Sequence, residues 1–212
     1  DGGCLNSPEF ASPLISDVIR NNIPNYQSVM REVLAYQIAQ SIGVGSIVPK
    51  TFMSIIQSES FNDLSEHVDP SELKRYFEHC SPADNEKLCS IQEFVPNAKT
   101  LFEAIQDLQQ AGLSNTEIAA RFDQKDIEDA NILIWTTYDT DGHRGNFLVY
   151  PKGTDEIGNE ILGLKKIDNA LSCPETNSHL FNGLAALPNA QVPLSEEGRA
   201  KILAIDIDKL AK

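Results

Sequence analysis

The feature that most constrains the fold of this chain is an expected β-hairpin with a polar loop before its first strand and another after its second strand. Residues 141–146 read Asp-Gly-His-Arg-Gly-Asn, and the apolar residues 147–150 follow them as a short buried strand. A polar turn then leads into a second apolar run, 161–167, which ends at Asp168. If the two runs pair, the end of the second strand returns beside the start of the first. The sequence therefore predicts that oxygen-bearing side chains converge here from two loops.

The side chains on these loops suit phosphoryl transfer from ATP bound to magnesium. Such a transfer depends mainly on positioning and charge neutralisation, and hard cations prefer oxygen ligands. Asn146 and Asp168 can supply oxygens to Mg²⁺ or Mn²⁺, and Asp141 can orient a substrate hydroxyl. Asp, Asn and Gly also gather in ordinary surface turns. A turn that binds nothing is therefore the alternative interpretation of the short string alone.

The chain resembles the phosphatidylinositol 3- and 4-kinases and their atypical protein-kinase relatives, most of all the type II phosphatidylinositol 4-kinases and similar bacterial proteins. These families carry Asp-x-His-x-x-Asn in the catalytic loop and Ile-Asp-Asn-Gly/Ala-Leu where ordinary protein kinases have Asp-Phe-Gly. Residues 141–146 match the first motif and residues 167–171 match the second. The resemblance spans about residues 28–205. Further stretches that match in order are 31–36 with 43–51, 90–95, and 187–195.

The resemblance implies an α+β, protein-kinase-like fold of the lipid-kinase type, with a mostly helical C-lobe and a reduced or truncated N-lobe. Residues 1–27 would be an N-terminal segment, and 28–95 a partial N-lobe that ends in a hinge strand. Residues 96–212 would be the helical C-lobe. The N-lobe would contain a polar insertion at 58–88, which is expected to be a variable loop. An element that binds a protein partner is the alternative for this insertion.

The resemblance also implies a role for each matching residue. Asp141 would accept or orient the proton of the substrate hydroxyl, and His143 would assist it or stabilise charge near the γ-phosphate. Asn146 and Asp168 would ligate magnesium. Glu32 would pair with a lysine on a neighbouring strand that touches the α- and β-phosphates. Backbone groups of the hinge would hold the adenine of ATP, and the hinge residues are Glu93, Phe94 and Val95.

The chain departs from the kinase pattern ahead of Glu32. A complete kinase has a glycine-rich loop and a strand lysine there, but the first lysine of this chain is Lys50. Residues 7–10, Ser-Pro-Glu-Phe, resemble an expression-vector junction, so the residues before Ala11 are expected to be foreign to the natural protein. That favours a truncated N-lobe over a naturally reduced one. A pseudokinase that binds nucleotide without transferring phosphate is the alternative to an active enzyme.

Net charge and hydropathy limit the classes of partner and substrate that this chain is expected to bind. The 212 residues carry a net charge of −14, which argues against nucleic acid and against stable attraction to an anionic membrane. No apolar run approaches the roughly 20 residues of a membrane helix, so a soluble chain is expected. The acidic chain favours a protein substrate, whereas the motifs favour phosphatidylinositol. The span between Lys166 and Arg199 holds no Lys or Arg that could bind further phosphates.

The expected location is the cytoplasm, or the cytosol of a host cell if the chain is a secreted bacterial effector. Peripheral membrane attachment is expected if the substrate is a lipid. The cysteines are spread too widely for a disulfide framework or a zinc site, so free thiols are expected. They are Cys4, Cys80, Cys89 and Cys173.

Periodicity and helix-capping signals predict the remaining elements. The helix at 126–138 is expected to be the most buried, with Trp135 and Tyr138 on its apolar face, and to deliver the catalytic loop from its C-terminal end. Residues 205–212 are expected to continue the last helix. The other expected helices are 28–42, 100–111, 114–122 and 195–203, and the other expected strands are 51–57 and 90–95.

Overall fold

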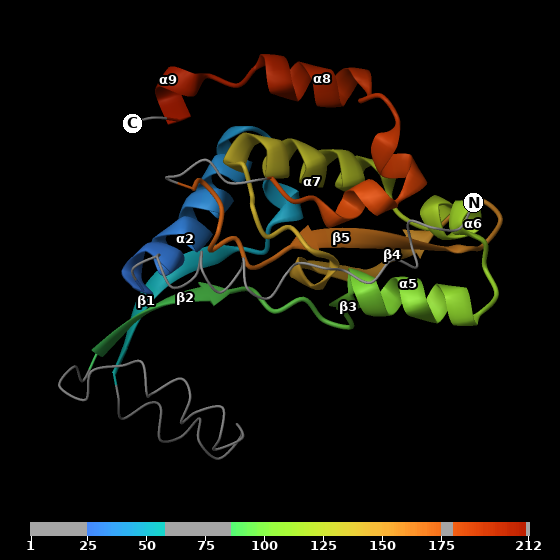
Figure 1. Cartoon of the computed structure of the whole chain (residues 1–212), viewed down its shortest axis with the longest axis horizontal. Helices are drawn as coiled ribbons and strands as arrows, with labels where there is room; N and C mark the ends of the chain where they lie inside the picture. Colours follow the sequence, from blue (N-terminus) through green and yellow to red (C-terminus); the bar gives the residue numbers. More distant parts are fainter. Residues whose placement is uncertain (1–24, 58–85, 175–179, 211–212) are drawn as a thin grey trace.

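The computed structural model describes residues 25–57, 86–174 and 180–210. It is a mixed α/β fold with two small antiparallel sheets, which confirms the predicted α+β class (Figure 1). In chain order the elements, with η for a 3-10 helix, are α2 (Asn25–Ser41), η1 (Gly45–Ile47), β1 (Thr51–Gln57), β2 (Glu86–Gln92), β3 (Lys99–Thr100), α5 (Leu101–Gln110), α6 (Asn115–Ala120), α7 (Gln124–Thr137), η2 (Arg144–Asn146), β4 (Phe147–Thr154), β5 (Glu160–Lys166), η3 (Gly183–Ala186), η4 (Pro188–Gln191), α8 (Glu196–Leu203) and α9 (Ile207–Leu210).

The first sheet pairs β1 with β2 and lies against α2. Thr51 pairs with Gln92 in an antiparallel register, and α2 contacts both strands (Figure 1). β1 has the predicted bounds. The prediction of a strand at 90–95 is wrong beyond Gln92, and residues 86–88 belong to β2 rather than to the expected insertion. The remainder of that insertion and the vector-like junction lie outside the described residues.

The second sheet, in the order β3-β4-β5, is built around the predicted hairpin. Phe147 at the start of β4 pairs with Lys166 at the end of β5, and a bulge lies between Pro151 and Gly153. α7 contacts β5, whereas α5 contacts β3 and β4, and Figure 1 shows these two helices on opposite sides of the sheet. The hairpin therefore has a helix on each face. Its first strand is longer than predicted, because it extends to Thr154.

Short polar motifs begin α5 and α6, two of the predicted helices. At the start of α5, the Thr100 hydroxyl accepts a hydrogen bond of 3.2 Å from the Glu103 N–H, and the Glu103 carboxylate accepts one of 2.8 Å from the Thr100 N–H. The same reciprocal box, Ser114 with Glu117, begins α6. Each box satisfies backbone donors that a helix start leaves without partners. These helix starts are therefore set by local sequence.

One apolar core joins α2 and η1 to the second sheet and its helices. Ala39 of α2 and Ile47 of η1 lie in the same buried cluster as Leu101 of α5 and Phe147 of β4. α7 supplies the centre, and its apolar side chains Ile127, Ala130, Leu133 and Ile134 are almost fully buried. The expected burial of this helix is confirmed for these positions.

The outer face of α7 differs from the prediction. Trp135 is 69% exposed and Tyr138 is 45% exposed, so neither belongs to the core. Glu128 and Asp129 are buried instead, because each is neutralised or hydrogen-bonded by another segment of the chain. Hydrophobic periodicity alone could not predict which aromatic side chains of α7 are exposed and which acidic ones are buried, because it takes no account of the partners of polar side chains.

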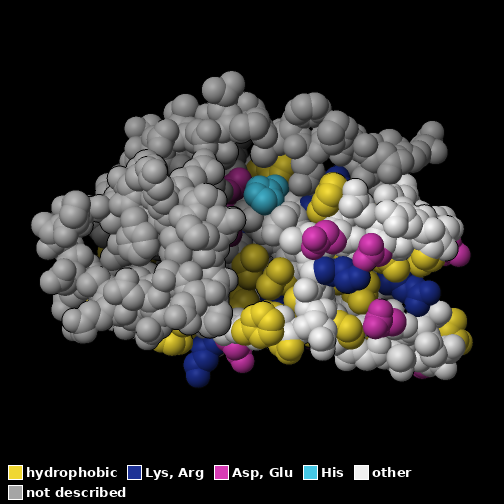
Figure 2. Space-filling view, turned by 90° about the horizontal axis from the view of Figure 1, so that it is seen from below, with side chains coloured by type: hydrophobic (Ala, Val, Ile, Leu, Met, Phe, Trp, Pro, Cys, Tyr) yellow, Lys and Arg dark blue, Asp and Glu magenta, His cyan; other side chains and the backbone are white. Residues whose placement is uncertain are grey.

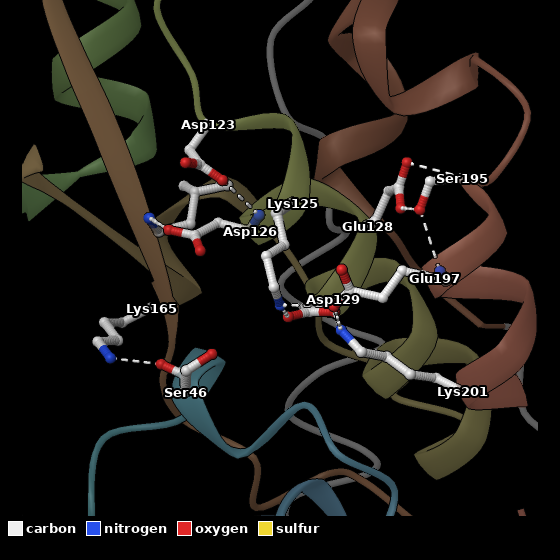
Figure 3. Close-up of polar contacts among 12 residues, drawn as sticks. Ser46, Asp123, Lys125, Asp126, Glu128, Asp129, Lys165, Ser195, Glu197 and Lys201 are labelled. Carbon is white, nitrogen blue, oxygen red and sulfur yellow. Dashed lines mark hydrogen bonds and ion pairs between the residues drawn. The ribbon is translucent and has the colours of Figure 1, made fainter. Parts of the chain in front are cut away.

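Polar contacts hold α8 against α7 (Figure 3). The Glu128 carboxylate accepts hydrogen bonds from the backbone N–H and the hydroxyl of Ser195, the residue that caps α8. Asp129 forms ion pairs with Lys125 and Lys201. The expected last helix is confirmed at 196–203, but the chain then leaves helical geometry, and the separate short helix α9 follows. The expected continuation of one helix through 205–212 is therefore wrong.

Charges of both signs lie side by side on the surface. On the face shown in Figure 2, Lys and Arg side chains (dark blue) adjoin Asp and Glu side chains (magenta). Within the described ranges, no helix has the length and apolar character needed to cross a bilayer.

Candidate active site

The loop after α7 begins with a residue in left-handed conformation. Tyr138 caps the helix with φ 48°, and Asp139, which follows it, is almost fully buried. Asp139 Oδ1 accepts a hydrogen bond of 3.0 Å from the backbone N–H of Asp141. Asp141 is itself only 5% exposed. The end of α7 thus sets where the backbone of Asp141 lies.

A segment far along the chain closes over this loop. The Phe181 N–H donates to the Asp139 carbonyl at 3.1 Å, and the Gly183 N–H donates to the Gly142 carbonyl at 2.7 Å. A Cβ added to Gly142 would lie 2.5 Å from the Phe181 carbonyl oxygen. Glycine is therefore required at this approach of two backbones.

Asn146 is oriented by the loop that carries Asp141. Its side-chain Nδ2 donates a hydrogen bond of 2.7 Å to the Asp141 carbonyl, and its side chain is buried. Because the amide nitrogen faces that carbonyl, Oδ1 points away from it. This is the orientation that a metal-binding amide needs.

His143 is held as a hydrogen-bond acceptor at Nδ1. The side chain caps η2, and Nδ1 accepts a hydrogen bond of 3.0 Å from the Gly145 N–H. A neutral imidazole that accepts at Nδ1 carries its proton on Nε2. In this tautomer His143 can donate from Nε2 to an anionic oxygen. It fits stabilisation of phosphate charge better than removal of a proton.

The structure brings Asp168 to the same place from the end of β5. The Ile167 N–H donates to the Asn146 carbonyl at 2.9 Å, so Asp168, the next residue after Ile167, lies near the loop that carries Asn146. Asp168 has φ 51°, a left-handed conformation that turns the chain sharply after the strand. Asp141, Asn146 and Asp168 thus lie on two adjacent loops, as the hairpin argument required.

Glu32 of α2 reaches these loops from the first sheet. Glu32 is 8% exposed, and its carboxylate accepts long hydrogen bonds from the side chains of Asn169, at 3.5 Å, and Gln92, at 3.4 Å. Burial raises the pKa of Glu32, and the charge of Asp168 adds to the rise, while the Asn169 backbone hydrogen bond and the charge of Lys166 oppose it. The structure therefore places Glu32 beside the Asp168 loop.

Lys166 is the lysine that lies buried in this region, and the sequence analysis did not single it out. Lys50, the first lysine of the chain and the lysine nearest to Glu32 in the N-lobe sequence, has an exposed side chain. Lys166 is fully buried, lies 2.9 Å from Asp139 Oδ2, and donates to the Ile167 carbonyl at 2.8 Å. One signal could have found it. Lys166 is two residues after the buried Leu164, so strand alternation puts both on the inner face.

The expected hinge follows β2 but is not part of it. The Glu93 N–H already donates to the Lys50 carbonyl at 2.8 Å, so this donor is not available to a ligand. The Phe94 side chain is 84% exposed. The predicted contact of the hinge with adenine stays a prediction for the Glu93 carbonyl and the Val95 backbone.

Arg31, next to Glu32, fastens α2 to the segment after Asp168. Its guanidinium is buried and donates to the carbonyls of Ser172, at 2.9 Å, and Cys173, at 3.0 Å. Arg31 lies in one of the matching stretches, but the resemblance implies no role for it. Only the packing of α2 shows what it contacts. Cys173 itself is a free thiol, as expected.

Asn146 and Asp168 are the residues that could hold a magnesium ion, and that role stays a prediction. Among the described residues, no group of three or more His, Cys, Asp or Glu side chains is arranged to hold a metal ion. Protein-bound magnesium usually takes one or two carboxylates together with substrate phosphates, and keeps some of its waters. The oriented amide of Asn146 and the carboxylate of Asp168 suit that mode, in which the nucleotide completes the site.

A separate groove of about 540 Å³ lies between α7, the η3–η4 segment and α8. Trp135 and Ile202 contribute apolar walls, and Asn131 and Asn182 contribute amides. None of the predicted site residues lines it. The groove accounts for the exposure of Trp135, which borders open space rather than the core.

Comparison with models of known protein families found no family that matches this chain, and comparison with curated proteins found no match either.

Proposed function

We propose that this chain is an ATP- and magnesium-dependent phosphotransferase with a protein-kinase-like fold of the phosphatidylinositol 3-/4-kinase type. The proposal is carried by the convergence of Asp141, Asn146 and Asp168 on two adjacent loops, with Glu32 of α2 beside them. Residues from three parts of the chain thus lie on neighbouring segments, which is the arrangement that the motifs imply. A surface turn would not need the buried partners that these residues have.

The reaction would move the γ-phosphoryl group of ATP to a hydroxyl. The hydroxyl oxygen bonds to the γ-phosphorus, the bond from that phosphorus to the bridging oxygen breaks, and ADP leaves. Asp141 would orient the hydroxyl and take up its proton. His143, with its proton on Nε2, would donate a hydrogen bond to the transferred group. Magnesium, when bound by Asn146 and Asp168, would neutralise phosphate charge.

Two substrate classes remain for this activity, a protein hydroxyl and phosphatidylinositol. The motif resemblance supports the lipid. The net charge of −14 and the lack of Lys or Arg between Lys166 and Arg199 support a protein. Incubating the chain with radiolabelled ATP and Mg²⁺, and with phosphatidylinositol vesicles or a cell extract as parallel acceptors, distinguishes them by which product is labelled.

The activity itself is tested by Asp141→Asn and Asp168→Asn. Both substitutions keep side-chain size, so we expect each to fold and to lower transfer about 10²–10⁴-fold, the usual range for loss of a general base or a comparable group. Circular dichroism and thermal unfolding check the fold. If both variants transfer phosphate as fast as the parent chain, the proposed site is wrong.

A nucleotide-binding module without transfer activity is the second candidate. It is favoured by Lys166, which is engaged by Asp139 and two carbonyls instead of reaching toward a ligand, and by the exposure of Lys50. Titration with a non-hydrolysable ATP analogue, with and without Mg²⁺, separates the candidates. Binding with no labelled product from any acceptor selects the module.

A further inference from the structure

The ion pair between Lys166 and Asp139 joins the two loops of the proposed site. Asp139 precedes Asp141 on the first loop, and Lys166 precedes Asp168 on the second. Each of the paired side chains is 1% exposed, and Nζ lies 2.9 Å from Oδ2. The pair is therefore a direct contact between the segments that carry the proposed base and the proposed metal ligand.

Each member of the pair also contacts the backbone of the functional residues. Asp139 Oδ1 accepts the Asp141 N–H at 3.0 Å. Lys166 Nζ donates to the Ile167 carbonyl at 2.8 Å and approaches the Asp168 carbonyl at 3.3 Å. A continuous chain of polar contacts thus runs from one functional backbone through the ion pair to the other.

The two charges depend on each other. Among the described residues, no donor makes a well-angled hydrogen bond to Asp139 Oδ2, so the Lys166 charge is what balances this oxygen. The Phe147 ring, 5.6 Å from Nζ, gives Lys166 an additional favourable contact. The loss of either member would leave a buried charge without compensation.

We propose that Lys166 and Asp139 are positioning residues, which set Asp141 at a fixed place relative to Asp168. This rests on the proposed function of the two loops. A buried ion pair adds little net stability compared with apolar residues of similar volume, because burial removes water from both charges. What the ion pair provides instead is a set of directional contacts that fix the positions of the two loops. Lys166 is fully buried with three oxygen neighbours, so it acts through Asp141 and Asp168.

The test compares single and double replacements of the pair in the full chain. Lys166→Met and Asp139→Asn each leave one buried charge, so each should lower the melting temperature. The double variant Asp139→Asn/Lys166→Met removes both charges and keeps an acceptor for the Asp141 N–H. We expect its melting temperature to return most of the way to that of the parent chain.

The double variant should nevertheless lose loop order. We expect amide hydrogen exchange in peptides covering 139–147 and 166–173 to be about tenfold faster than in the parent, with α7 unchanged. The kcat for transfer should fall about 100-fold, the effect of a misplacement of roughly 1 Å, with little change in KM for ATP. Affinity for a non-hydrolysable ATP analogue should also lose its dependence on Mg²⁺.

Lys201→Met is the matched control. Lys201 also pairs with a buried carboxylate, Asp129, at 2.6 Å, but it joins α7 to α8. Asp129 keeps its second partner, Lys125, so we expect a smaller fall in melting temperature than for Lys166→Met, with unchanged exchange in the two loop peptides and unchanged kcat. The control separates loss of a buried ion pair in general from loss of this one.

Each outcome decides the proposal. A folded double variant with parental loop exchange would overturn it, and so would a double variant that does not fold, because the pair would then serve folding alone. If the parent chain transfers no phosphate, the proposed enzyme activity fails, yet hydrogen exchange and the Mg²⁺ dependence of analogue binding still test the positioning role.

Discussion

At the scale of single residues, Gly142 lies where the backbone of the Asp141 loop meets the backbone of residues 181–183. Its carbonyl accepts the Gly183 N–H, and the space for a side chain is taken by the Phe181 carbonyl, 2.5 Å from an added Cβ. A carbonyl oxygen in the backbone cannot move aside as a flexible side chain can. Asp141 is adjacent, so a shift here is transmitted to the proposed base.

We expect Gly142→Ala to lower the free energy of unfolding by about 1–3 kcal/mol, the usual effect of an added methyl group in a packed site. Gly153→Ala is the control, because an added Cβ there meets nothing within 4 Å. Urea denaturation of both variants measures the difference. Equal stability of the two variants would contradict the packing argument.

The candidate functional residues were selected from sequence, and their functional roles stay predictions, but the residues that contact them could not be predicted from sequence. Asp141, Asn146 and Asp168 are recognisable because their types and spacing suit metal and phosphate chemistry. Asp139 and Lys166 support them, and their role depends on burial of opposite charges from segments far apart in sequence. The spacing of residues in the sequence does not indicate that Asp139 and Lys166 are in contact.

Helix starts were predictable at the element scale because their causes are local. The Thr100–Glu103 and Ser114–Glu117 boxes each need only four consecutive residues. The end of β2 and the exposed Trp135 were not predictable. The bounds of β2 follow its pairing with β1, and the exposure of Trp135 follows the groove beside α7.

Asp123, which caps α7, should make stability depend on pH. Partial burial acts to raise its pKa, but hydrogen bonds from the Asp126 backbone and from Lys152 outweigh this and lower the pKa below the ordinary 3.8. A lowered pKa means that the charged form stabilises the fold above the unfolded-state pKa, and that this is lost as pH falls through the lower folded-state value.

The pH effect is measured with Asp123→Asn, which keeps the cap but not the charge. We expect the variant to be less stable than the parent by about 0.5–1 kcal/mol at pH 6. The gap should shrink once the pH falls below about 4 and close below the folded-state pKa. Urea denaturation across this range checks it. A gap that stays constant with pH would show that the charge of Asp123 does not stabilise α7.

At the scale of the whole molecule, α2 connects the first sheet to the proposed site. Its apolar residues share the common core, and Arg31 and Glu32 contact the segment around Asp168. The order of the motifs implied that these regions meet. The contacts that join them required the packed structure, because they depend on the rotation of α2 against the sheet.

Arg31→Met should remove the hydrogen bonds that hold α2 to the segment after Asp168. It leaves the buried carbonyl of Ser172 and the carbonyl of Cys173 without their Arg31 donor, so we expect a loss of about 3 kcal/mol in the free energy of unfolding. The control, Arg199→Met, removes an exposed arginine that donates to one carbonyl, and should change stability by less than about 0.5 kcal/mol. Thermal unfolding of both variants compares them. A similar small change in both would contradict the anchoring role.

The bonds from Phe181 and Gly183 to the loop at 139–142 also bear on the order in which the chain acquires its structure. During synthesis the loop leaves the ribosome before the residues that close over it. Contacts between distant segments form only after the intervening chain has been ordered or looped out, which slows them relative to helix formation. The helices with local caps can therefore form early. The Asp141 loop completes its backbone bonds only once residues 181–183 have been made.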